Sequence, residues 1–251
     1  MRLWIDTDVG DNVDDAIALA VAAAHPDIEI AGVSTVGGDL ERRADLARTL
    51  VPARVPVTAG IDPDRVAAAG PGALLAIGPL TNVAALTAAG RRPHRLVIMG
   101  GALAPVGHRG RRVRVEHNFA SDPAAAAATL AVPGATIVTL DATVATHLDD
   151  VDRLRLAAAA PVLRPLIDEW LDRPARAGVA EADRAVHLHD PAAVLVAAGE
   201  DVVRSHETRT LEVQADGRLA ETAAGTAHHV VLALDAAAVA GRCISLLRAR
   251  D

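Results

Sequence analysis

Short apolar segments alternate with amphipathic segments along most of this chain. The apolar segments predict strands at 2–6, 28–35, 55–58, 74–77, 96–99 and 136–140. The amphipathic segments predict helices at 14–24, 39–51, 80–89, 122–130 and 149–159. Apolar strands that alternate with amphipathic helices are typical of a mostly parallel sheet covered by helices on both faces. The pattern therefore predicts an open α/β fold.

The last third of the chain follows a different pattern. Predicted strands at 208–213 and 218–222 flank Asp216-Gly217, a dipeptide that strongly favours a hairpin turn. A strand at 230–234 and a final helix that ends near residue 248 follow. Because no linker or repeat interrupts the alternation, we expect a single domain over residues 1–251 that contains this β-hairpin.

Composition and charge exclude several classes of protein. The 251 residues can bury a full core, and 51% hydrophobic with 23% charged residues is typical of a globular chain. A net charge of -7 argues against nucleic-acid partners. No apolar run reaches the roughly 18 residues of a membrane span. The single cysteine, Cys243, excludes an internal disulfide framework and suits a reducing cytoplasm, where we expect the protein to reside. All 25 basic residues are arginine, so lysine chemistry is excluded as well.

Five carboxylates fall within ten residues directly after the first predicted strand: Asp6, Asp8, Asp11, Asp14 and Asp15. In an open α/β sheet, ligands bind beyond the carboxyl ends of the strands, which is where this segment lies. Clustered carboxylates repel one another unless a cation neutralises them, and oxygen ligands select Ca²⁺ or Mg²⁺. Acids at a helix start also complement the helix dipole, but that effect does not explain Asp6 and Asp8.

Two known motifs compete for this acidic segment. An EF-hand loop does not fit, because Gly10, Asp11 and Ile17 occupy its third acidic, glycine and terminal glutamate positions. The segment 6–10 resembles the opening of the aspartyl-phosphate phosphatases up to its last residue. Those enzymes also use a downstream basic residue, usually lysine, for which only arginine is present here. The phosphatase remains an alternative.

Four further segments accompany the acidic one, each at a strand end or a helix start. They are Gly32–Asp39, Gly78–Asn82, Met99-Gly100-Gly101 with Glu116-His117-Asn118 and Asp122-Pro123, and Leu188–Pro191. In this order the segments resemble the calcium-dependent nucleoside hydrolases, the inosine–uridine-preferring N-ribohydrolases, over residues 1 to about 240. The resemblance implies a Rossmann-like fold, hydrolysis of a ribonucleoside or related N-riboside to ribose and base, and a homodimer or homotetramer.

The resemblance also implies a Ca²⁺ site. The carboxylates of Asp8, Asp15 and Asp190 and the main-chain carbonyl of Thr81 would bind the ion. Asp190 would also contact the sugar, and Asp14 would hold ribose hydroxyls that reach the metal. For catalysis, the resemblance implies that Asp8 takes a proton from the attacking water and that Asp14 acts beside it.

Other residues would hold the rest of the nucleoside. The resemblance implies that Glu116 and Asn118 bind the sugar near its 5′ side, that Met99 lines the pocket, and that Asp39 replaces an asparagine common in the family. The resemblance also makes His189 a candidate to protonate the departing base. The alternative is that His189 only packs or hydrogen-bonds behind the site while Asp190 does the work. We expect His187 to point to the opposite face, as alternate residues of an extended strand do.

The sequence departs from the family where the base should bind. Residues 60–73 form a much shorter stretch than relatives carry and lack a counterpart to their base-contacting histidine. Aromatic residues that could stack on a base are scarce, and Trp170, the one candidate, also fits a helix core. The sequence therefore leaves two readings: an active ribohydrolase with an unassigned leaving group, or a family member that binds a ribosyl ligand without turnover.

Overall fold

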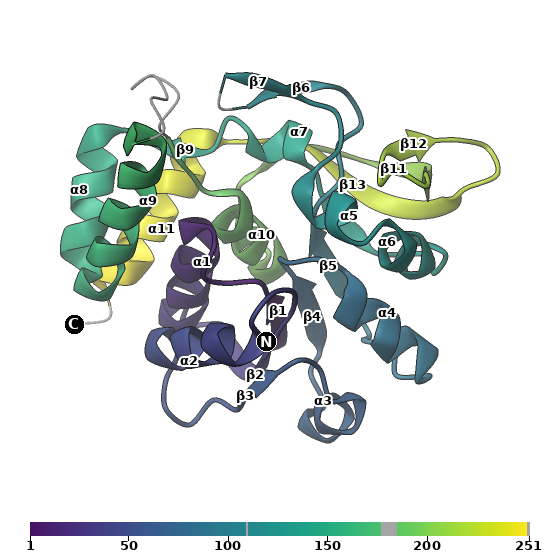
Figure 1. The fold of residues 1–251 in the computed structure, drawn as a ribbon, viewed down its shortest axis with the longest axis horizontal. Helices are drawn as coiled ribbons and strands as arrows, with labels where there is room; N and C mark the ends of the chain where they lie inside the picture. The colour runs from purple at the N-terminus through teal and green to yellow at the C-terminus, as the bar shows by residue number, and fades with distance from the viewer. Residues whose placement is uncertain (109, 177–184, 250–251) are drawn as a thin grey trace.

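The computed structural model describes residues 1–108, 110–176 and 185–249. The strands of its main sheet are β1 (Arg2–Thr7), β2 (Glu29–Thr35), β3 (Val57–Ala59), β4 (Ala73–Ala76), β5 (Leu96–Met99), β8 (Thr136–Val138), β11 (Val203–Val213), β12 (Leu219–Glu221) and β13 (Thr226–Leu234). The nine strands lie in the order β12-β11-β13-β8-β5-β4-β1-β2-β3 (Figure 1). Strands from β13 to β3 are parallel, and β11 and β12 add an antiparallel edge.

Two short antiparallel ribbons lie outside the main sheet. One pairs β6 (Val106–His108) with β7 (Arg111–Val113), and the other pairs β9 (His147–Leu148) with β10 (Val186–His187). The helices are α1 (Val13–Ala24), α2 (Leu40–Leu50), α3 (Pro63–Ala69), α4 (Thr81–Ala88), α5 (His117–Ser121), α6 (Pro123–Leu130), α7 (Leu140–Thr143), α8 (Asp150–Ala159), α9 (Arg164–Arg176), α10 (His189–Ala198) and α11 (Ala236–Arg248), with a 3₁₀ turn at Pro161–Leu163.

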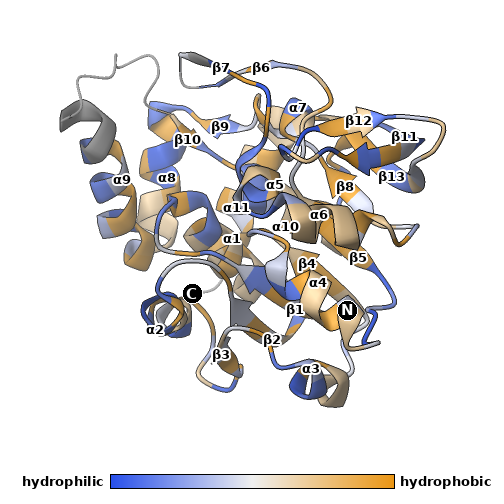
Figure 2. Cartoon of the chain, turned by 45° about the vertical axis from the view of Figure 1, so that its right-hand side comes forward, coloured by the Kyte–Doolittle hydropathy of each residue, from blue (hydrophilic) through white to orange (hydrophobic). Residues whose placement is uncertain are grey.

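Helices cover both faces of the sheet because successive strand residues point to opposite sides. In β1, Leu3 and Ile5 join the apolar core beneath α1, α10 and α11, whereas Trp4 joins the second core with α4 and α6. Gly32 on neighbouring β2 leaves room for the Trp4 ring, since a Cβ there would lie 2.4 Å from it. Figure 2 shows the central strands β4 and β5 in hydrophobic colours between these layers.

The strand order reverses direction between β1 and β4. From β1 the chain continues outward to β2 and β3, whereas β5, β8 and β13 extend from β4 toward the other edge. The loops after two such neighbouring strands diverge to opposite faces of a sheet and leave a crevice beyond their carboxyl ends. The acidic segment follows β1 and Gly78 follows β4, so both border this crevice.

The structure confirms the mostly parallel α/β sheet with helices on both faces, and the hairpin of β11 and β12 around Asp216-Gly217. The pattern did not predict the β6–β7 ribbon or the short helices α3 and α5. No helix in the described part of the chain has the length and apolar character to cross a membrane. A single domain over 1–251 stays a prediction, since residues 109, 177–184 and 250–251 lie outside the described residues.

Candidate active site

A cavity of about 460 Å³ opens in the crevice beyond β1 and β4. Eight residues predicted for the site lie in its wall: Asp8, Asp14, Asp15, Met99, Glu116, Asn118, His189 and Asp190. They come from the β1–α1 loop, α1, the end of β5, the start of α5 and the start of α10. Segments far apart in sequence therefore meet at one place, as the topology of the sheet predicts.

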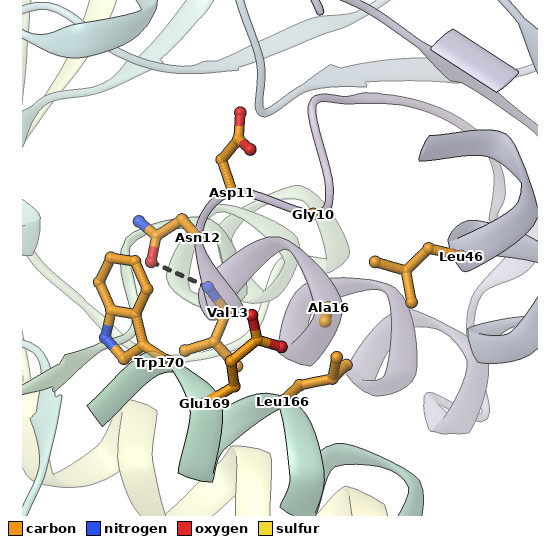
Figure 3. A pocket seen from close by; sticks show the side chains of 9 residues that line it. All are labelled: Gly10, Asp11, Asn12, Val13, Ala16, Leu46, Leu166, Glu169 and Trp170. Atoms are coloured by element: carbon orange, nitrogen blue, oxygen red, sulfur yellow. Dashed lines mark hydrogen bonds between the residues drawn. The ribbon is translucent and has the colours of Figure 1, made fainter. Parts of the chain in front are cut away.

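The centre of the site is a group of buried carboxylates. Asp14 and Asp15 lie in the first turn of α1 and Asp190 in the first turn of α10, and one oxygen from each lies within 4.8 Å of the others. The Thr7 hydroxyl donates a hydrogen bond of 2.6 Å to Asp15 Oδ1, which orients that carboxylate. The Asn12 side chain caps α1 by accepting from the Val13 amide (Figure 3).

Burial and mutual repulsion make these carboxylates hard to ionise together. Loss of hydration raises the pKa values of Asp15 and Asp190 well above the usual value of an aspartate. The negative charges of the neighbouring aspartates raise both pKa values further. A bound divalent cation would remove this penalty, and an all-oxygen donor set fits a hard ion. The described residues thus include a group that fits Ca²⁺ or Mg²⁺.

Asp8 lies against the end of β4. A Cβ on Gly78 would lie 2.9 Å from the Asp8 amide nitrogen and 3.0 Å from Oδ1, so only glycine allows this approach. Burial raises the pKa of the Asp8 carboxyl, while the charges of Arg43 and His117 lower it. His117 Nε2 lies 4.0 Å from Asp8 Oδ2 at the exposed side of the cavity.

Arg43 holds the acidic loop from behind, a role that the sequence did not reveal. Its guanidinium donates to the main-chain carbonyls of Val9 at 3.1 Å and Gly37 at 2.8 Å, and pairs with Asp11 at 2.6 Å. The side chain is almost fully buried on α2, so it fixes the path of the loop that carries Asp8. A basic residue in an Arg-rich helix has no sequence signature for this contact.

Asp6 is buried beneath the cavity rather than in its wall. Its Oδ1 accepts hydrogen bonds from the Ser34 hydroxyl and from Asn82 Nδ2, which ties β1 to β2 and α4. Burial raises the pKa of Asp6 to about 7. These contacts make Asp6 a link between β1, β2 and α4 beneath the site.

Glu116 and Asn118 are locked into the main chain around them. Both Glu116 oxygens accept from backbone amides, those of Gly101, Asn118 and Phe119, which makes Glu116 the cap of α5. Asn118 Nδ2 donates to the carbonyls of Ile77 and Met99 at 3.2 and 3.1 Å. Burial raises the pKa of the Glu116 carboxyl. Their positions at the cavity are therefore fixed before any ligand enters.

Comparison with known proteins assigns the chain to a family. The sequence profile of the inosine-uridine preferring nucleoside hydrolases matches residues 55–240. The chain belongs to the nucleoside hydrolase family. No relative was found among curated proteins. Family membership disfavours the aspartyl-phosphate phosphatase reading of the acidic segment.

Solved nucleoside hydrolases share the fold over nearly the whole chain. A plant nucleoside hydrolase is 19% identical with a TM-score of 0.81, and 98% of each chain is covered. The purine-preferring ribonucleoside hydrolase from Gardnerella vaginalis is 20% identical with a TM-score of 0.80, and the inosine-uridine preferring enzyme from Bacillus anthracis is 19% identical with a TM-score of 0.75, each with 99% of both chains covered.

The structure does not bring two of the predicted residues to the cavity. Thr81 is the first residue of α4, where its carbonyl points along the helix, and its exposed hydroxyl donates to Asp122. Ile77, four residues earlier, lines the cavity instead. Asp39 caps α2 through the Arg42 amide and is exposed beside a different, smaller cavity.

The histidines at the cavity differ from the expectation. The rings of His187 and His189 stack with centroids 5.0 Å apart, whereas we expected them on opposite faces. That expectation was wrong because the strand β10 ends at His187, and the backbone turns at Leu188 into α10. His108 from β6 lies beside both rings, and His189 Nδ1 is 2.8 Å from the Thr143 hydroxyl. Trp170 from α9 also lines the cavity and lies beside Asn12 (Figure 3).

Proposed function

We propose that this chain hydrolyses the N-glycosidic bond of a ribonucleoside or related N-riboside to give ribose and base. The observation that carries the proposal is the buried group of Asp14, Asp15 and Asp190, with Asp8, in one wall of the cavity. Membership of the nucleoside hydrolase family supports it.

The carboxylates suit the reaction because breaking the bond between the sugar and the base builds positive charge on the ribose ring. Negative groups fixed in a cavity with little water stabilise such charge strongly, and they need not reorganise as it develops. We propose that Asp14 holds the ribose hydroxyls, and that Glu116 and Asn118 border the 5′ side of the sugar.

Asp8, Asp15 and Asp190 would hold Ca²⁺, and we propose the carbonyl of Ile77 as the main-chain ligand in place of Thr81. When bound, Ca²⁺ would anchor the 2′- and 3′-hydroxyls, position the attacking water and make it more acidic. Selectivity for ribose over deoxyribose follows, because a ligand without the 2′-hydroxyl leaves a buried polar site unsatisfied.

Asp8 would take a proton from water as the water oxygen attacks C1′. The bond from C1′ to the base nitrogen breaks, and its electron pair leaves with the base. We propose that His189 gives a proton to that nitrogen, since histidine changes its charge near neutral pH. Its Nδ1 contact with Thr143 fixes the direction of the ring. Self-association as a homodimer or homotetramer and a cytoplasmic location are further parts of this proposal.

Release of reducing sugar from a panel of ribonucleosides and nicotinamide riboside tests the proposal. We expect release that requires Ca²⁺, stops with EDTA and is absent in Asp8→Asn. Asp149→Asn is the matched control, because Asp149 caps α8 at an exposed position and an asparagine oxygen can still accept from Asp152. Silence across the panel, while Ca²⁺ with ribose still raises the melting temperature, would instead indicate a ribosyl-binding protein. Silence without a thermal shift would refute the site.

A further inference from the structure

Three histidines form a cluster beside the carboxylates. The ring centroids of His108, His187 and His189 lie 4.5 to 5.1 Å apart, and one ring nitrogen from each lies within 4.8 Å of the others. We propose that these three histidines form a second metal site, separate from the carboxylate group, for a borderline transition ion such as Zn²⁺.

The cluster is assembled from three separate elements. His108 ends β6, His187 ends β10, and His189 begins α10. His187 and His189 are buried, with 8% and 6% of their surface exposed, and His108 is half-buried on the β6–β7 ribbon. Converging histidines from distant parts of a chain are a common way to build a metal site, whereas two adjacent histidines on one surface are not.

The donor set separates this site from the carboxylate group. Imidazole nitrogen suits Zn²⁺, Cu²⁺ and Ni²⁺, whereas carboxylates and carbonyls suit Ca²⁺ and Mg²⁺. With metal–nitrogen bonds of about 2.0–2.1 Å, a tetrahedral ion needs its nitrogens about 3.4 Å apart. The rings of His187 and His189 lie nearly parallel, at 8° to one another, so the His187 ring must turn for both to face one ion. With rotation of His108 on its half-buried ribbon, the nitrogens would then close by up to about 1.4 Å.

His189 already has the support that metal-bound histidines usually show. Thr143 engages Nδ1 at 2.8 Å, so Nε2 is the nitrogen that would bind an ion. Thr143 is fully buried in α7, which makes this contact rigid. Such outer contacts fix the ring orientation, and their loss typically weakens metal binding by about 10–100-fold.

The site would open into the cavity, because His108 and His189 both line it. Three protein ligands leave the fourth position of a tetrahedral ion for water or for a ligand. A heteroaromatic ring nitrogen is a suitable occupant, since borderline ions favour such donors. The buried carboxylates nearby would offset the added positive charge. This inference does not rest on the proposed hydrolysis, because the ion alone can be measured. An ion on His189 Nε2 would displace the proton that His189 is proposed to give to the base, so the Zn²⁺-bound chain should release ribose more slowly than the Zn²⁺-free chain.

Titration of the chelator-stripped full chain with Zn²⁺, in excess Ca²⁺, tests the inference. We expect one Zn²⁺ per chain, and Co²⁺ to bind in its place with the visible bands of a nitrogen-rich tetrahedral site. Affinity should fall by at least about 100-fold in His108→Ala and in His187→Ala, more than for loss of an outer contact. Thr143→Val should weaken binding by about 10–100-fold.

His147→Ala is the matched control. Its ring lies 5.8 Å from His187 on the paired strand, but it is exposed and outside the cluster, so Zn²⁺ affinity should not change. Asp15→Asn should also retain Zn²⁺. Three results would overturn the inference. The first is equal Zn²⁺ affinity in wild type and His108→Ala. The second is loss of Zn²⁺ binding in Asp15→Asn while the histidine variants retain it, and the third is no stoichiometric binding. If His187→Ala does not fold, His108→Ala on the half-buried ribbon decides the question.

Discussion

Replacement of Gly78 by alanine tests whether the close approach of Asp8 to β4 sets both stability and activity. The new Cβ would lie 2.7 Å from Val36 Cγ1, 2.9 Å from the Asp8 amide nitrogen and 3.0 Å from Asp8 Oδ1. Ordinary contact begins at 3.4 Å, so the Asp8 main chain must retreat by about 0.5 Å. Overpacking of this kind costs about 1–3 kcal/mol. At about 2–4 °C per kcal/mol, the melting temperature should fall by about 2–12 °C.

The activity of Gly78→Ala should fall further than stability alone explains. A misplaced catalytic group loses up to about 100-fold in rate, and Asp8 is the proposed base. We therefore expect kcat/KM for ribose release to fall about 10–100-fold at a temperature where the variant stays folded. Thermal unfolding and ribose release at saturating Ca²⁺ measure the two effects.

Gly72→Ala is the control for Gly78→Ala. Its added Cβ would lie 3.6 Å from the Arg2 carbonyl oxygen, an ordinary contact, so melting temperature and kcat/KM should stay near wild type. Wild-type values of both quantities in Gly78→Ala would refute the reasoning. A lower melting temperature with unchanged kcat/KM would refute the role of Asp8 alone.

Three other predictions concern Asp190, the proposed Ca²⁺ site and the apolar core. Asp190→Asn should abolish ribose release as Asp8→Asn does, whereas Asp149→Asn should keep it; turnover in Asp190→Asn would contradict the site. Ca²⁺ should raise the free energy of unfolding by about 2.7 kcal/mol at 100 times its Kd. At one fixed Ca²⁺ concentration the gain should be larger at pH 8 than at pH 5. The raised pKa values of Asp15 and Asp190 make the ion-free folded chain hold protons that the unfolded chain releases above about pH 4, so the ion-free stability falls as pH rises, and at pH 5 Ca²⁺ must compete with these protons. Calorimetry that finds no such difference would contradict it. Phe119→Ala should cost about 3–5 kcal/mol in chemical denaturation, because its buried ring packs against Gly100 and Gly101.

The main sheet was predictable because its strands are apolar and its helices amphipathic. β5 was predicted at its observed bounds, and β1 and α1 within one residue at each end. The β6–β7 ribbon could not be predicted, because its three-residue strands, Val-Gly-His and Arg-Arg-Val, are too short to show an alternating pattern, and they pair only with each other. Short helices such as α3 contain too few turns for an apolar stripe to repeat.

The carboxylate half of the site was predictable because its residues directly follow strands or begin helices. Thr81 shows the limit of that reasoning. The turn at Gly78-Pro79 separates the end of β4 from α4, and sequence does not say which carbonyl of such a turn faces inward. For His187, the assumption of an extended backbone was at fault, since Leu188 has φ -117° and ψ 46°. Arg43 was missed because its partners Val9 and Gly37 use main-chain oxygens, which every residue possesses.

The two halves of the cavity rest on different kinds of structure. Asp15 and Asp190 stand on helix starts at the edge of a rigid sheet, where small displacements are resisted by the packed core. His108 stands on a two-stranded ribbon, which is marginally stable unless it packs on something else. Substitutions on the ribbon should therefore perturb the rest of the fold less than substitutions in the crevice. In the proposed function, the carboxylate side would hold the sugar and the ribbon side would face the base, the side where the sequence departs from the family.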